Sequence, residues 1–275
     1  MKKENVPNDG PARFIPALLM ISALGLVLSG CAAGRVAPRP APYDSPEAAL
    51  RALAAPLPAG QTITATASIL INDHGQKTPL KVALMIRQPA SLRVESIPVM
   101  GPPDFFLSIA GGELRVFLPG KAGGTFYTGR ATPKALYRFF PIALPAEEMI
   151  PLLMGRLPPD DRKAPYSLIG EWEGGFYRID RCVRGRKVRS VWINPAGNLI
   201  IRIRTFGEGE IAAYTADFSE YTRLEGSVLP RRLVIGGEAM PEMTIRYTDL
   251  RQMAADPDSF MLAVPEGIAP TALDE

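Results

Sequence analysis

The feature of the sequence that most constrains the fold is a side-chain period of two, which starts near residue 61. Along residues 61–71, apolar side chains alternate with threonine and serine. This alternation is typical of a β-strand with one buried face and one solvent-facing side. Comparable runs follow along most of the chain, without the strand–helix–strand order that builds a parallel sheet. The sequence therefore predicts a mainly β protein.

We expect about eleven strands in a single large, curved, antiparallel sheet within residues 45–275. The run Asn-Pro-Ala-Gly-Asn at 194–198 marks a tight hairpin turn. The segments with strand-like patterns, from which these strands would form, are residues 61–71, 80–87, 90–96, 105–109, 114–118, 166–173, 175–183, a hairpin over 187–206, 210–224, 226–236, 242–253 and 259–265.

Three short helices are expected beside this sheet. Ser45 before Pro46 and Thr132 before Pro133 both have the pattern of a capping residue followed by proline at the first helical position. They predict helices over 48–53 and 133–140. A third helical stretch covers 144–155, where Pro151 is expected to kink or split the helix.

The N-terminal residues 1–30 have the order of an export signal. Lys2, Lys3 and Arg13 precede an apolar run of 15 residues, 14–28, and small residues follow. As a helix that run would be about 22 Å long, short of the roughly 30 Å hydrocarbon core. A cleaved signal is therefore favoured over a permanent transmembrane helix.

The signal ends in Leu28-Ser29-Gly30-Cys31, which resembles the lipobox of bacterial lipoproteins. The resemblance implies that Cys31 carries a covalent diacylglycerol and an N-acyl chain; the alternative is a signal peptide with a chance cysteine. Alanines follow Cys31 where inner-membrane lipoproteins often have aspartate, which favours a lipid-anchored, periplasm-facing protein of the outer membrane. The proline-rich residues 31–44 would then form a tether of about 40 Å.

Residue patterns for catalysis are sparse, and we expect a protein that is not an enzyme and binds neither metal nor cofactor. The chain lacks Gly-x-Ser-x-Gly, His-Glu-x-x-His and Cys-x-x-Cys motifs. Its only histidine, His74, is expected in a solvated turn, and Asp160 and Asp161 in a solvated loop. With Cys31 acylated, Cys182 has no disulfide partner and is expected to be a half-buried strand residue. A formal charge of +3 argues against nucleic-acid binding.

A cluster of basic residues lies in the expected hairpin at 178–189. Its members are Arg178, Arg181, Arg184, Arg186, Lys187 and Arg189, with Asp180 as the one acid among them. Two interpretations stay open. The cluster is either the solvent face of a basic turn, or a contact site for anionic headgroups or an acidic partner.

The loop over 96–108 is unusual because Val99 and Met100 lie between Pro98 and Gly101. Proline and glycine predict a tight loop, and loops usually face water. The two apolar side chains either project from the loop or fold back onto the sheet.

Residues 91–118 and 126–158 resemble the LolA/LolB-like lipoprotein carrier family, nearest to its outer-membrane receptor branch, LolB. The matching elements are Met100-Gly101, Tyr127, residues 133–140, Leu144-Pro145 and residues 155–158. The resemblance implies a half-open β-barrel in which short helices form a lid over an apolar cavity for acyl chains. The candidate lid residues are Leu136, Phe139, Phe140, Met149, Ile150 and Leu153.

The same resemblance implies that Val99, Met100 and Gly101 form a loop that contacts the membrane. It also implies acylated lipoproteins or other lipids as ligands, and a periplasmic carrier protein as donor. A second function class stays open, in which a non-enzymatic envelope lipoprotein uses the same sheet as a scaffold or a glycolipid-binding module. An apolar concave face available to ligands favours the first class, and a cavity filled by its own side chains favours the second.

Overall fold

The computed structural model describes residues 43–53, 60–121, 123–159, 164–207, 211–238 and 240–273. All of them belong to one compact unit, Ala41–Glu275. The predicted signal segment 1–30, the predicted acylation site Cys31, most of the predicted tether, and Asp160 and Asp161 lie outside the described residues.

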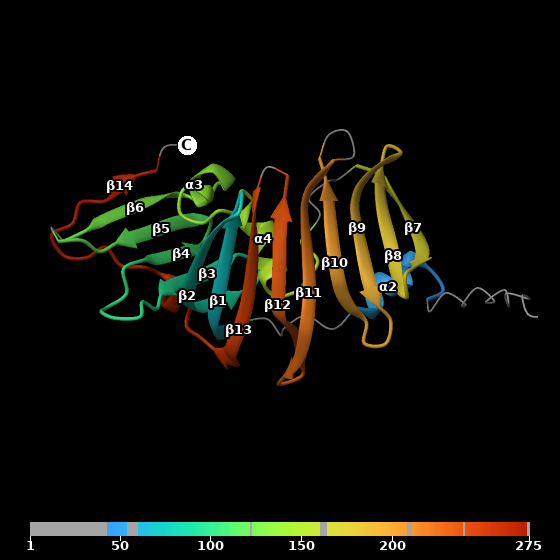
Figure 1. Ribbon diagram of the computed structural model, residues 1–275, viewed down its shortest axis with the longest axis horizontal. Helices are drawn as coiled ribbons and strands as arrows, with labels where there is room; N and C mark the ends of the chain where they lie inside the picture. Colours follow the sequence, from blue (N-terminus) through green and yellow to red (C-terminus); the bar gives the residue numbers. More distant parts are fainter. Residues whose placement is uncertain are drawn as a thin grey trace, which may run out of the picture. The chain divides into compact units, whose positions relative to one another are not determined.

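The strands of the described part form one open sheet of 14 strands, in the order β14-β6-β5-β4-β3-β2-β1-β13-β12-β11-β10-β9-β8-β7 (Figure 1). Their bounds are β1 Gln61–Asp73, β2 Gln76–Arg87, β3 Ser91–Ser96, β4 Phe106–Ala110, β5 Glu113–Leu118, β6 Thr125–Arg130, β7 Tyr166–Glu173, β8 Phe176–Val183, β9 Arg186–Asn194, β10 Leu199–Phe206, β11 Ala212–Leu224, β12 Ser227–Gly237, β13 Met240–Ala254 and β14 Thr271–Ala272. The sheet does not close, and β14 and β7 are its two edges.

The prediction of one large, mainly antiparallel sheet is confirmed, but the number of about eleven strands is wrong. Strand β6 is not among the expected strands, which have a gap between residues 118 and 166. Strand β14 was also not expected. It pairs in parallel with β6 through Thr271 and Ala272, so the sheet is not antiparallel throughout.

The expected strand at 259–265 is also absent, since this stretch contains a 3-10 helix, η2 (Pro257–Phe260), and then continues without strand pairing. Its backbone carbonyls accept hydrogen bonds from side chains of the sheet instead of from a neighbouring strand. Arg93 on β3 donates to the Ser259 carbonyl at 3.0 Å, and Arg115 on β5 donates to the Leu262 carbonyl at 3.1 Å. Phe260 is fully buried, with the Arg87 guanidinium 4.6 Å from its ring centroid.

The period of two predicted from the sequence appears as two distinct faces of the sheet. On β1 the side chains of Ile63, Ala65, Ala67 and Ile69 are buried, and they belong to the same hydrophobic cluster as alternate residues of the neighbouring strands. We call this side of the sheet the inner face and the opposite side the outer face. Burial of the inner face is the main stabilising interaction of the fold.

Two helices begin where the capping patterns predicted. Helix α2 (Pro46–Ala52) is capped by Ser45, whose Oγ accepts a hydrogen bond from the Ala48 N–H at 3.1 Å. Helix α3 (Pro133–Tyr137) is capped by Thr132, whose Oγ1 accepts from the Ala135 N–H at 3.2 Å. In both helices proline occupies the first turn, where its missing N–H costs no helical hydrogen bond.

The third helix, α4, runs unbroken over Ala146–Leu153 with Pro151 inside it, so the predicted split does not occur. Pro151 is the sixth of eight residues, and its missing N–H removes only one bond from a helix that is about to end. None of the helices in the described part of the chain is long and apolar enough to cross a membrane.

Candidate functional site

Helix α4 packs against the inner face of the sheet, and Figure 1 shows it behind the middle strands. Six of its eight residues are buried, among them Met149, Ile150, Leu152 and Leu153. This burial places the apolar side of a short helix against the concave surface where the resemblance predicts a ligand cavity.

Two tyrosines of the sheet hold α4 in place. The Tyr247 hydroxyl on β13 donates to the Leu153 carbonyl at 2.9 Å, and the Tyr214 hydroxyl on β11 donates to Glu148 Oε2 at 2.9 Å. Burial raises the pKa of both phenols, and the nearby Glu148 carboxylate raises that of Tyr214 further. Both tyrosines therefore stay neutral donors at physiological pH.

The chain leaves α4 through Gly155, which lies very close to β12. A Cβ at this position would stand 2.6 Å from Pro230 Cδ, and the backbone φ of +65° is one that residues with side chains rarely adopt. Glycine is therefore required here by both its conformation and its lack of a side chain.

The predicted lid residues all lie on the inner side of the sheet, in or against the main hydrophobic cluster. Leu136, Phe140, Met149, Ile150 and Leu153 are buried, and Phe139 is half-buried with its ring 5.2 Å from that of Tyr127. These side chains pack directly on the inner face of the sheet. Their role as a lid over a bound lipid stays a prediction.

Two cavities open near Leu50 of α2 and Leu157, which line both of them. The first, of about 290 Å³, also contacts Leu53, Arg156 and Tyr221. Burial lowers the pKa of Arg156, whose Nη2 donates to the Val228 carbonyl at 3.4 Å.

The second cavity, of about 320 Å³, lies against β7, β8 and β9 and is lined by apolar residues and by Arg181 and Arg189. Neither cavity was predicted. One feature of the sequence does point to the second cavity. Arg189 has the same strand phase as the apolar Val191 and Ile193, which places a cation on the face that these residues bury.

The loop between β3 and β4 presents its two apolar side chains to solvent. Val99 is fully exposed and Met100 is 88% exposed, and in Figure 1 the loop projects beyond the strands. The loop does not fold its tip back onto the sheet. Gly101 at the tip has a φ of +89°, which a glycine adopts without strain.

The base of this loop is fixed by hydrogen bonds around Ser96. The Ser96 hydroxyl donates to Asp104 Oδ1 at 2.6 Å and accepts from the Asp104 and Phe105 N–H groups at 3.0 and 3.1 Å. The Ile97 N–H donates to the Lys81 carbonyl at 2.7 Å. These hydrogen bonds fix the base of the loop, while its apolar tip, Val99 and Met100, is exposed to solvent.

A groove of about 590 Å³ lies between this loop and the outer face of β1, β2 and β13. Its exposed apolar residues are Leu70, Leu80, Ile97 and Val99. They lie beside Lys81, Asp104 and Arg246 in the lining, and exposed apolar residues rimmed by polar ones often mark an interaction site.

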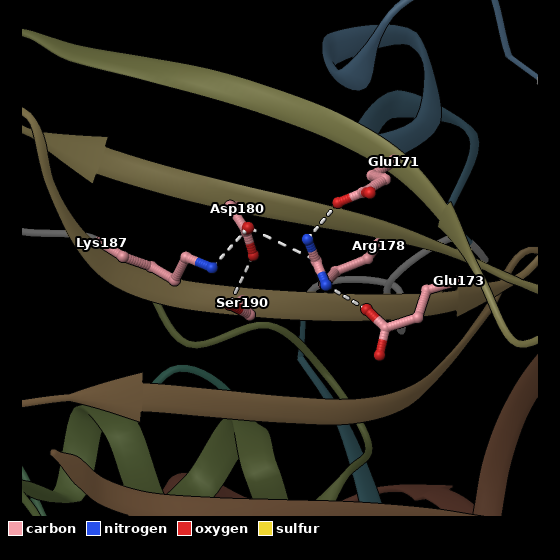
Figure 2. A network of polar contacts seen from close by, with 6 residues as sticks. All are labelled: Glu171, Glu173, Arg178, Asp180, Lys187 and Ser190. Carbon is pink, nitrogen blue, oxygen red and sulfur yellow. Dashed lines mark hydrogen bonds and ion pairs between the residues drawn. The ribbon is translucent and has the colours of Figure 1, made fainter. Parts of the chain in front are cut away.

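Two of the six cations of the basic hairpin, Arg178 and Lys187, have acidic partners in Figure 2. Arg178 contacts both Glu171 and Glu173 on β7, and its Nε lies 3.3 Å from Asp180 Oδ2. Lys187 Nζ lies 2.7 Å from the same oxygen, and the Ser190 hydroxyl donates to Asp180 Oδ1 at 2.6 Å. This network explains Arg178 and Lys187 as structural residues rather than as a headgroup contact.

The two remaining candidate residues lie apart from each other. Cys182 is buried in β8, and the side chain of His74 is almost fully exposed at the turn between β1 and β2. Across the residues that the structure describes, no group of three histidine, cysteine, aspartate or glutamate side chains is arranged to hold a metal ion.

Comparison with known proteins identifies the fold. No protein-family model matches the chain, and no curated protein matches it in sequence. A solved LolA superfamily protein from Nitrosomonas europaea is 11% identical, with a TM-score of 0.52, over 78% of this chain and 97% of that chain. A DUF1329 family protein from Desulfovibrio piger is 14% identical, with a TM-score of 0.52, over 74% of this chain and 90% of that chain.

At these identities the likeness shows the fold alone. The chain has a LolA-like fold, in which one open sheet carries short helices on its inner face.

Proposed function

We propose that this protein binds acyl chains on the inner face of its sheet, beneath α3 and α4, and helps to receive lipoproteins and insert them into the outer membrane. In this proposal it is a LolB-like, non-enzymatic protein that is anchored through acylated Cys31 and faces the periplasm. Its partners are acylated lipoproteins, a periplasmic carrier that delivers them, and the membrane surface.

The observation that carries the proposal is the packing of α4 on the inner face. Six of the eight residues of α4 are buried against an apolar concave surface, and two tyrosine hydrogen bonds attach the helix. Displacing this short helix would uncover an apolar trough without breaking any strand pairing. The small side chains of Ala65, Ala67 and Ala216 lie on the same face.

The physical need for such a trough follows from the cost of exposing acyl chains to water. At about 0.8 kcal/mol per CH₂ group, one sixteen-carbon chain costs on the order of 12 kcal/mol to expose. An acyl chain in transit must therefore pass directly from one apolar site to another. When the side chains of α4 leave the inner face, the acyl chain would take their place there.

The loop tip supplies the membrane contact in this proposal. Burying an exposed valine or methionine side chain is worth about 1.5 to 3 kcal/mol. Val99 and Met100 together would give a reversible contact with the bilayer rather than an anchor. The exposure of both side chains in a loop with a fixed base supports this role.

A second candidate function is supported by the filled state of the inner face. The buried side chains of α4 occupy the concavity themselves. This favours a non-transport envelope lipoprotein that uses the sheet as a scaffold or as a glycolipid-binding module.

Native mass spectrometry of the full chain distinguishes these two candidates. The protein would carry Cys31→Ser, so that a covalent anchor cannot be mistaken for a ligand. We expect non-covalent adducts with the masses of acyl lipids, which disappear after delipidation and return on incubation with palmitate. A chain that stays ligand-free under both conditions would contradict acyl binding and favour the scaffold role.

A further inference from the structure

A row of polar side chains crosses the otherwise apolar inner face of β8 to β11. Arg181 pairs with Arg189, Arg189 with Thr205, and Thr205 with Tyr214, each as cross-strand neighbours. Directly opposed residues of adjacent strands share a face of the sheet. Arg189, Thr205 and Tyr214 are only 8%, 6% and 1% exposed.

Arg189 Nε in this row is buried and has no hydrogen-bond partner in the part of the chain that the structure describes. The Arg189 side chain makes one hydrogen bond, from Nη1 to the Pro158 carbonyl at 2.9 Å, and no carboxylate among the described residues forms an ion pair with it. A buried charge for which the described residues supply no counter-ion favours an anion that completes its environment.

The charges around Arg189 strengthen this preference. Burial, and then the positive charge of Arg189, lower the pKa of Arg181. The Glu148 carboxylate on α4 accepts the hydrogen bond of Tyr214 at the other end of the row. A second positive charge close to Arg189 favours an anionic ligand at this end.

Arg181 and Arg189 both line the cavity of about 320 Å³ between α2 and the β7–β9 end of the sheet. This volume is at the lower end of the range for small-molecule sites. The rest of its lining is mainly apolar and includes Leu50, Leu157, Leu168, Ile179 and Val191. We call it the Arg189 cavity.

We propose that the Arg189 cavity binds an anionic group, phosphate or carboxylate, at the end of an acyl lipid whose chain lies on the apolar inner face. A guanidinium presents its donors in a planar fork that matches the oxygens of either anion. The placement of the acyl chain on the inner face rests on the proposed function. The placement of the anionic group in the Arg189 cavity does not.

The test compares four ligands on the full chain carrying Cys31→Ser, by competition with a fluorescent acyl probe and by calorimetry. The ligands are hexadecyl phosphate, palmitate, hexadecanol and inorganic phosphate. We expect the two anionic lipids to bind about tenfold more tightly than hexadecanol, as a charged hydrogen bond predicts. Equal affinity for all three lipids would overturn the anion site and leave the proposed function standing.

Variants locate the effect. Arg189→Gln should remove most of the preference for anionic lipids while hexadecanol binds as before, and Arg181→Gln, which removes the second cation of the lining, should weaken the preference. Arg204→Gln is the matched control, because it removes the same charge from β10, where Arg204 packs over Trp192. An unchanged preference in both correctly folded test variants would overturn the site.

Binding of inorganic phosphate shows whether the cavity takes a free anion or the anionic group of a lipid. Binding of phosphate alone at the affinity of hexadecyl phosphate would assign the cavity to a free anion and overturn the lipid assignment. If none of the lipids binds, the proposed function fails. The anion site is then supported by phosphate binding that Arg189→Gln abolishes, and overturned if phosphate does not bind.

Discussion

The hydroxyl of Tyr214 on β11 donates a hydrogen bond to the carboxylate of Glu148 on α4, with 2.9 Å between the two oxygens. This bond joins the helix that fills the inner face to the strand beneath it. If α4 moves aside to admit an acyl chain, this bond must break.

Tyr214→Phe removes this bond while keeping the ring in the core. We expect the free energy of unfolding to fall by about 1 kcal/mol, the usual net worth of one hydrogen bond. We also expect faster amide hydrogen exchange in α4 and tighter binding of an acyl probe. Tyr247→Phe, which removes the bond to the Leu153 carbonyl, should act in the same direction. Exchange in α4 that equals the wild type in both variants would show that these bonds do not hold the helix.

Met100→Glu places a charge at the exposed tip of the β3–β4 loop. Because this side chain is 88% exposed, stability and acyl-probe binding should not change. Flotation with phospholipid vesicles should fall several-fold, since a carboxylate disfavours entry into the bilayer. Met253→Glu is the matched control, because Met253 is also exposed but lies at the end of β13. Equal flotation of the Met100 variant and the wild type would contradict the membrane contact.

Asp180→Asn tests whether the network of the basic hairpin is structural. The Asp180 carboxylate is buried and contacts Arg178, Lys187 and Ser190 (Figure 2). Its neutralisation leaves two cations without this partner, and we expect a loss of about 2 kcal/mol in urea denaturation. Asp217→Asn breaks the partly exposed pair with Arg202 and should cost less than about 1 kcal/mol. Equal losses in the two variants would refute a structural role specific to Asp180.

Gly155→Ala tests the close approach between the end of α4 and β12. The added Cβ would lie 2.6 Å from Pro230 Cδ, and overpacking of this kind costs about 1 to 3 kcal/mol. Gly174→Ala is the control, because its φ of +57° is also positive while no atom lies within 4 Å of the added Cβ. The difference between the two midpoints of thermal unfolding measures the contact alone, and no difference would show that the helix end moves freely.

Local chemistry made several elements predictable from the sequence. Ser45-Pro46 and Thr132-Pro133 fix helix starts through a side-chain cap and a preset φ, and both helices start there. The turn at 194–198 fixes the hairpin of β9 and β10 in the same way. These signals act within a few residues, so no tertiary information is needed to recognise them.

The elements that sequence reasoning missed depend on distant partners. The apolar stretch at 259–265 has the composition of a strand, but Arg93 and Arg115 bind its carbonyls and Phe260 fills a site on the sheet. Strand β14 has two residues and exists only because β6 is beside it.

The polar row on the inner face is not visible in the sequence for the same reason. Its members come from four strands, and only the register of those strands brings Arg181, Arg189, Thr205 and Tyr214 side by side. The exposure of Val99 and Met100 also needed the structure, because the sequence left open whether the loop tip turns inward.

Photo-crosslinking with a diazirine-bearing palmitate is the most direct test of the central claim that acyl chains bind on the inner face. After irradiation of the full chain carrying Cys31→Ser, we predict labelled peptides from α4 and from the inner-face positions of β1 and β2, such as Ile63 and Leu84. Labelling confined to the groove beside the β3–β4 loop, at Leu70, Pro79 and Ile97, would contradict the account.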